Sequence, residues 1–133
     1  MRNDVADALM TIMPCAEPGS LTAEFCFDPA LAIFQGHFPG RPILPGILQI
    51  EMVRYAVEVF TGNRYGIDRV SKAKFTGEII PREVVGMDAA FSIDAEVTRV
   101  NATLHIGQTV AASISMILKK GTSMHDRGSE SIP

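Results

Sequence analysis

The stretch PGILQIEMVRYAVEVF, residues 45–60, predicts one helix of about 16 residues. It opens with a proline, which the first helical turn tolerates, and Thr61-Gly62-Asn63 follows as a stop signal. Most of the circumference of this helix is apolar, so the rest of the chain must surround it. Its polar positions are Gln49, Glu51, Arg54 and Glu58.

The other segments alternate with period two, which is typical of strands. In residues 21–27, for example, Leu21, Ala23 and Phe25 fall on one face and Thr22 and Glu24 on the other. The same alternation predicts further strands at residues 84–94, 97–106 and 109–118, and weaker ones at 9–15 and 66–75. Residues 106–109 are expected to form a hairpin turn.

The predicted order is therefore two strands, one helix and four strands. This order suits an α+β fold in which one curved antiparallel sheet is wrapped around one long central helix. We expect residues 1–120 to form a single domain. Residues 121–133 are polar, rich in Gly and Ser and without periodicity, and are expected to form a flexible C-terminal tail in which His125 is inert.

Composition excludes several classes of function. The 133 residues carry 12 basic and 15 acidic side chains without a basic cluster, which argues against nucleic acid as a partner. No apolar run approaches the roughly 18 residues of a spanning helix, so we expect no membrane insertion. Asp4 and Asp7 lie where a signal peptide would be basic, which predicts a cytoplasmic protein.

Metal and disulfide chemistry are not expected either. The two cysteines, Cys15 and Cys26, are too few for a disulfide framework or a closed zinc site and are interpreted as free thiols. His37, His105 and His125 are far apart in the sequence and form no ligand pair. We therefore predict no metal and no cofactor.

Residues 34–51, FQGHFPGRPILPGILQIE, crowd two Pro-Gly pairs, a histidine and a glutamate before and into the helix. One interpretation is structural: Glu51, Arg54 and Glu58 form a solvated stripe with ordinary ion pairing, and His37 is a loop residue. In the other, His37 and Glu51 converge as base and acid, while amides near Gly46 hold an oxyanion. Spacing alone leaves both interpretations open.

Residues 36–51 resemble the signature of the beta-hydroxyacyl-acyl-carrier-protein dehydratases (FabZ/FabA-like) of the hot-dog fold. The match is ungapped from Phe34 through Glu51, and the interval of 14 residues from His37 to Glu51 equals the catalytic interval of that family. Weaker similarity at residues 66–68 and 72–75 extends the resemblance over residues 20–119.

The resemblance implies a homodimer or a trimer of dimers, in which His37 of one subunit faces Glu51 of the other. It implies dehydration of (3R)-3-hydroxyacyl thioesters on acyl carrier protein to trans-2-enoyl thioesters. His37 would be the base and Glu51 the acid, while Gly46, Phe38 and Phe75 would bind the substrate.

The resemblance also indicates where further contacts would lie. An acyl tunnel would have its depth set by residues such as Met52, Phe75 and Ile79. The candidates for a basic patch that meets the carrier protein are Arg41, Lys72, Lys74 and Arg82.

The sequence departs from the family after Glu51, where Met52-Val53-Arg54-Tyr55 replaces the usual Ala-Met-Ala-Gln. This departure fits general fatty-acid synthesis. It also fits a specialised pathway, such as one that makes polyenes or other secondary metabolites. Glu rather than Asp at position 51 resembles the branch that only dehydrates. The alternatives are a hot-dog acyl thioesterase and a non-catalytic protein that binds an acyl carrier.

Overall fold

A computed structural model describes residues 2–34, 40, 42–94 and 96–121. His37, Phe38 and Arg41 lie outside the described residues, as does the predicted tail beyond Gly121. The helices and strands are α1 (Arg2–Ala8), β1 (Leu9–Pro14), β2 (Ser20–Cys26), the short 3-10 helix η1 (Ala32–Phe34), α2 (Gly46–Thr61), β3 (Tyr65–Phe75), β4 (Val84–Ile93), β5 (Val97–Ile106) and β6 (Thr109–Lys120).

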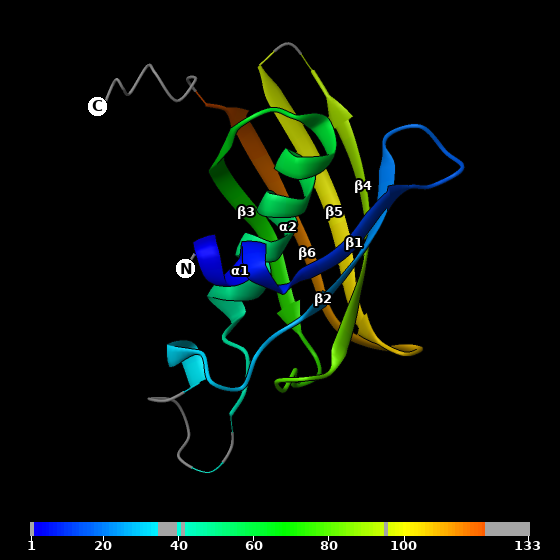
Figure 1. Cartoon of the computed structure of the whole chain (residues 1–133). Helices are drawn as coiled ribbons and strands as arrows, with labels where there is room; N and C mark the ends of the chain where they lie inside the picture. The colour runs from blue at the N-terminus through cyan, green and yellow to red at the C-terminus, as the bar shows by residue number, and fades with distance from the viewer. Residues whose placement is uncertain (1, 35–39, 41, 95, 122–133) are drawn as a thin grey trace.

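The strands form one antiparallel sheet in the order β1-β2-β4-β5-β6-β3, so β1 and β3 are its edges. The sheet curves around α2, which crosses its concave face (Figure 1). Gly107, with a φ of 58°, lies in the turn that joins β5 to β6. The α+β class, the long central helix, the six strands and this hairpin are confirmed.

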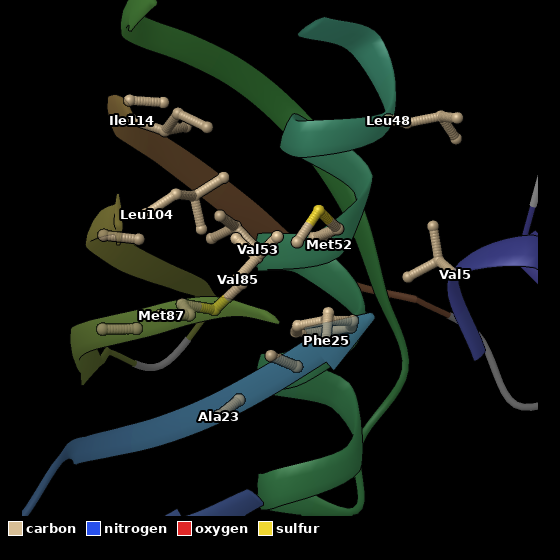
Figure 2. Packing of buried hydrophobic residues seen from close by; sticks show 14 of the residues in the cluster. Val5, Ala23, Phe25, Leu48, Met52, Val53, Val85, Met87, Leu104 and Ile114 are labelled. Atoms are coloured by element: carbon tan, nitrogen blue, oxygen red, sulfur yellow. The ribbon is translucent and has the colours of Figure 1, made fainter. Parts of the chain in front are cut away.

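The core lies between α2 and the concave face of the sheet. Figure 2 shows Met52 and Val53 of α2 facing side chains of the sheet such as Phe25 and Met87. All four of these side chains are at most 1% exposed. The helix is therefore held by burial of apolar area, which contributes roughly 25 cal/mol per Å².

The short helix α1 was not predicted. Its side chains Val5 and Ala8 are buried, and α1 packs against α2. Seven residues are too few to show helical periodicity, and a helix this short is stabilised by tertiary packing rather than by its own sequence. Within the part of the chain that the structure describes, no helix combines the length and apolarity that crossing a bilayer requires.

Candidate active site

The N-terminus of α2 brings together two of the predicted substrate residues. Pro45 is extended and α2 begins at Gly46. The ring of Phe75, at the end of β3, packs on the backbone of Gly46 so closely that a Cβ there would stand 2.8 Å from Phe75 Cζ. The first amides of a helix have no partner within it, so this end can hold developing negative charge.

A groove of about 380 Å³ lies beside this contact. Its lining residues are Ile43, Leu44, Gly46, Gln49, Phe75, Thr76, Gly77 and Glu78. Met52 and Ile79, expected to set the depth of a tunnel, are not among them and are 0% and 1% exposed in the core. Phe75 is 44% exposed and forms part of the wall.

Gln49 is a polar group of this groove that the sequence analysis did not assign. It is 3% exposed, and its Nε2 donates to the carbonyl oxygen of Leu44 at 3.2 Å. Its Oε1 is buried without a hydrogen-bond partner among the described residues. A buried amide oxygen in that state is an available acceptor for a donor in the groove. The only sequence signal was a glutamine within an otherwise apolar helix segment.

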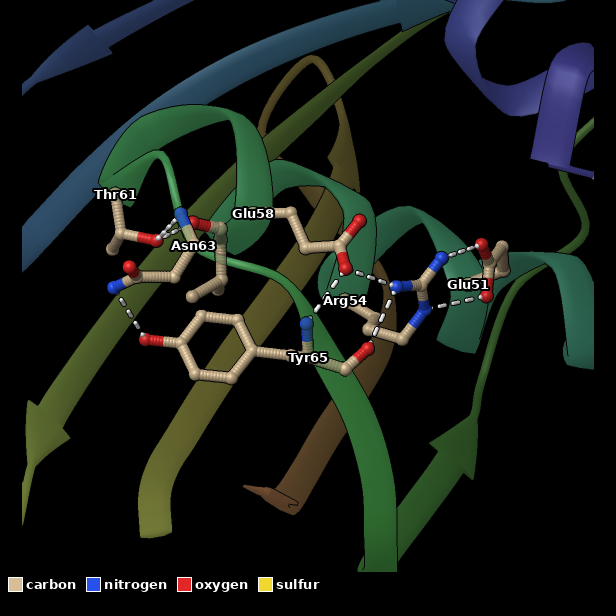
Figure 3. A network of polar contacts seen from close by, with 7 residues as sticks. Glu51, Arg54, Glu58, Thr61, Asn63 and Tyr65 are labelled. Atoms are coloured by element: carbon tan, nitrogen blue, oxygen red, sulfur yellow. Dashed lines mark hydrogen bonds and ion pairs between the residues drawn. The ribbon is translucent and has the colours of Figure 1, made fainter. Parts of the chain in front are cut away.

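Glu51 lies a turn and a half into α2 and is held by Arg54 (Figure 3). Arg54 Nε donates to Glu51 Oε1 at 2.9 Å, and Arg54 Nη2 pairs with Glu51 Oε2. Arg54 Nη1 lies 2.7 Å from Glu58 Oε2 and donates to the carbonyl oxygen of Tyr65 at 2.9 Å. The amide of Tyr65 in turn donates to Glu58 Oε2 at 2.7 Å, which ties α2 to the start of β3.

The predicted ion pairing along this stripe is confirmed, but the stripe is not solvated. The side chains of Glu51, Arg54 and Glu58 are 14%, 9% and 6% exposed. The hydrogen bond to Glu51 raises the pKa of Arg54 above its ordinary value, with the charges of both carboxylates adding to this effect and burial opposing it. Arg54 is therefore a permanent buried cation between two carboxyl groups.

Of the predicted site residues, the structure brings Gly46 and Phe75 together, whereas Glu51 does not line the groove beside them. Gly46, Phe75 and Glu51 all lie at or near the N-terminal half of α2, whereas His37 and Phe38 lie outside the described residues. The convergence of His37 with Glu51 therefore stays a prediction. Among the described residues no cluster of His, Cys, Asp or Glu side chains is suited to hold a metal ion, and Cys15 and Cys26 are free thiols.

A second polar cluster lies on the other face of the sheet. His105 Nε2 is 3.0 Å from Asp88 Oδ2, and His105 Nδ1 is 3.1 Å from the carbonyl oxygen of Gly107. The imidazole lies over Gly86, where a Cβ would stand 2.2 Å from His105 Cε1. This cluster is separated from Glu51 by the sheet.

Solved structures show that the architecture is the hot-dog fold, an α+β sheet around a central helix. The chain is similar to the dehydratase heterocomplex ApeI:P of Xenorhabdus doucetiae, with a TM-score of 0.68 and 20% identity over 84% of this chain and 96% of that one. It is also similar to a point mutant of the fluoroacetyl-CoA-specific thioesterase FlK, with a TM-score of 0.67 and 13% identity over 88% and 94% of the two chains. The fold is thus shared by enzymes of different activities.

Sequence relatives show the family to which the chain belongs. The chain is 35% identical over 103 residues to the 3-hydroxyacyl-(acyl-carrier-protein) dehydratase FabZ of Chlamydia trachomatis, covering 68% of this chain and 67% of that protein. It is 30% identical over 86 residues to FabZ of Clostridium acetobutylicum, covering 59% of this chain and 57% of that protein. Residues 14–114 match the family model of the ApeI-like dehydratases. The chain belongs to this dehydratase family.

Proposed function

We propose that the chain dehydrates (3R)-3-hydroxyacyl thioesters carried on acyl carrier protein to trans-2-enoyl thioesters. The proposal is carried by helix α2 in a chain of the dehydratase family. This helix begins at Gly46, against the ring of Phe75, and carries Glu51 a turn and a half further on. Residues 1–120 would form the catalytic domain. The pathway would be fatty-acid synthesis or a related one that makes polyenes or other secondary metabolites, and the FabZ relatives support the reaction itself.

In the proposed reaction His37 removes a proton from C2 of the substrate. The charge that develops on the thioester oxygen is stabilised by the first amides of α2 at Gly46. Glu51 gives a proton to the C3 hydroxyl, which leaves as water, and the C2–C3 double bond forms. The reaction removes one water and transfers no electrons to another molecule, so it needs no oxidant or reductant.

A homodimer would complete the site, with His37 of one subunit beside Glu51 of the other. Among the strands that the structure describes, β3 has a neighbour on one side only, which supports such an assembly because an unpaired edge exposes a row of backbone donors and acceptors. This strand is 11 residues long and carries the exposed side chains Ile67, Val70 and Phe75. Pairing through β3 would cover this edge.

The carrier protein would approach the same end of the molecule. Lys72 and Lys74 are exposed on β3, near the Phe75 end of the groove, and Arg82 is exposed after it. Exposed cations at the mouth of a groove favour an acidic partner by steering its approach. We propose that these side chains receive the carrier protein, while the groove beside Gly46 takes the acyl thioester.

The test incubates the purified protein with 3-hydroxyacyl and trans-2-enoyl thioesters of several lengths on carrier protein, and follows the gain or loss of one water by mass. The reaction should fall by a factor of at least about 100 in His37→Ala and in Glu51→Ala. His105→Ala and Glu24→Ala are the matched controls, since both residues line a different pocket from the groove beside Gly46. Release of free acid would instead identify a thioesterase, and no reaction on any thioester would identify a non-catalytic protein.

A further inference from the structure

Arg54 occupies a position where the resembling family has alanine, and its contacts are directed at the proposed acid. The guanidinium uses Nε and Nη2 for the two oxygens of Glu51, and Nη1 for Glu58 and the carbonyl oxygen of Tyr65. Two parallel bonds to one carboxylate fix both its position and its rotation. Glu51 is thus oriented by a neighbour one turn further along α2.

The second carboxylate decides whether such an arrangement can take part in proton transfer. With Glu51 alone, protonation would leave Arg54 as an uncompensated buried cation, which is costly. Glu58 lies 2.7 Å from Nη1 and is itself anchored by the amide of Tyr65 at 2.7 Å. When Glu51 holds a proton, Arg54 and Glu58 remain a neutral pair, so Glu51 can pass between its two protonation states without that cost.

Few other charges face this network from the neighbouring elements that the structure describes. On α1, Asp4 and Asp7 line a separate pocket with Asp28. Strand β1, LMTIMP, carries no titratable side chain. On β3 and β6, Asp68 lies 3.9 Å from Lys119 at the surface, and Lys120 acts on the hydroxyl of Tyr65.

We infer that Arg54 is the positioning residue of Glu51: it fixes the place and the rotation of the carboxyl group, while Glu58 compensates the charge of Arg54 whenever Glu51 is protonated. The inference rests on the proposed function and deepens it.

Arg54 and Glu58 have opposite charges, so their removal should have opposite effects on the protonation of Glu51. The test measures kcat/KM for dehydration by the intact protein from about pH 3.5 to 10, so that the range includes the ordinary pKa of a glutamate. One limb of the profile should move to higher pH by about one unit or more in Arg54→Gln, and to lower pH in Glu58→Gln. Arg54→Lys should keep that limb near its original place but lower kcat about tenfold, because an ammonium group cannot bond both oxygens in a fixed plane.

The control is Arg99→Gln, which removes an exposed guanidinium from its pair with Asp94 and should leave the profile unchanged. If Arg54 only stabilised the fold through its bond to Tyr65, both Arg54→Gln and Glu58→Gln would lower activity. Their pH profiles would then not shift in opposite directions. That result would overturn the inference. Should Arg54→Gln not fold, the double variant Arg54→Gln/Glu58→Gln removes both charges and should still move the limb upward.

Failure of the proposed function is distinguishable. If the unmodified protein exchanges no water on any thioester, the proposed reaction is wrong. The carboxyl resonance of Glu51, followed by ¹³C NMR over the same pH range, then tests the pairing alone. Opposite displacements of its titration in Arg54→Gln and Glu58→Gln support the inference, and equal or absent displacements overturn it.

Discussion

The ring of Phe75 lies against the backbone of Gly46, where a Cβ would stand 2.8 Å from Phe75 Cζ. Gly46 begins α2 and Phe75 ends β3. The start of the helix and the end of the following strand therefore meet in space, although they are far apart in the sequence. The absence of a side chain at position 46 is what lets the aromatic ring form a wall of the groove beside the helix amides.

Gly46→Ala should displace the Phe75 ring, because the methyl group would occupy its place. Phe75 is 44% exposed and can turn away, so the free energy of unfolding should fall by only about 1 kcal/mol. The kcat/KM for the thioester should fall about tenfold or more, since the wall of the groove has moved. Gly121→Ala is the control, because a Cβ there would meet nothing closer than 3.6 Å. Equal kcat/KM for both variants would contradict the assignment of Gly46 and Phe75 to the substrate site.

Val70→Lys should weaken the dimer. Val70 is 36% exposed on the free edge strand β3, and a lysine on both copies of a paired edge would bring like charges together. Sedimentation at several protein concentrations should show a larger monomer fraction, with activity lost in proportion. Ile93→Lys, at the end of β4 and 57% exposed, should leave the assembly unchanged. A dimer that tolerates Val70→Lys would place the interface elsewhere.

Gly86→Ala should expel the imidazole of His105 from its place over β4, because the new Cβ would stand 2.2 Å from His105 Cε1. We expect a loss of about 1–3 kcal/mol in the free energy of unfolding. Combining it with His105→Ala should recover most of that loss, since the clash is with this ring alone. A double variant as unstable as Gly86→Ala would show that the strain lies in the backbone.

Tyr65 should contribute to stability at alkaline pH. Burial raises the pKa of its phenol, but hydrogen bonds from Thr98, Asn63 and Thr61 and the charge of Lys120 together lower the pKa below its ordinary value of 10.0. The folded protein therefore favours the phenolate, a contribution that is present above pH 10 and lost as the pH falls through the lowered pKa. Urea unfolding of the unmodified protein and of Tyr65→Phe should show the stability difference shifting toward the unmodified protein as the pH rises. A difference that does not vary with pH would contradict this assignment.

Much of the fold was predictable because its elements are long and periodic. Alternation of apolar and polar residues identified four strands clearly and the two edge strands, β1 and β3, only weakly, because most of their side chains are exposed. The apolar circumference of residues 45–60 identified the buried helix. The structure begins α2 at Gly46 and ends it at Thr61, within a residue of the prediction. Helix α1 escaped because its seven residues depend on packing against α2, which no local pattern reports.

The site was predictable only in part. The spacing of Glu51, Arg54 and Glu58 indicated pairing along the helix, yet not its burial, because burial depends on Tyr65 at the start of the next strand. The contact between Gly46 and Phe75 joins elements that local patterns treat separately. The free acceptor of Gln49 is likewise a product of tertiary packing, since only the folded chain removes water from it.

The pairing of β3 with β6 has a consequence for synthesis on the ribosome. Phe75 pairs with Ala112 and Tyr65 with Lys120, so β3 emerges well before the strand that completes it. Until β6 is made, the nascent chain carries an apolar helix and a strand, β3, that has no neighbouring strand on either side. Such a topology delays folding until the last strand is made and leaves the growing chain open to aggregation, which is when a chaperone would be most useful.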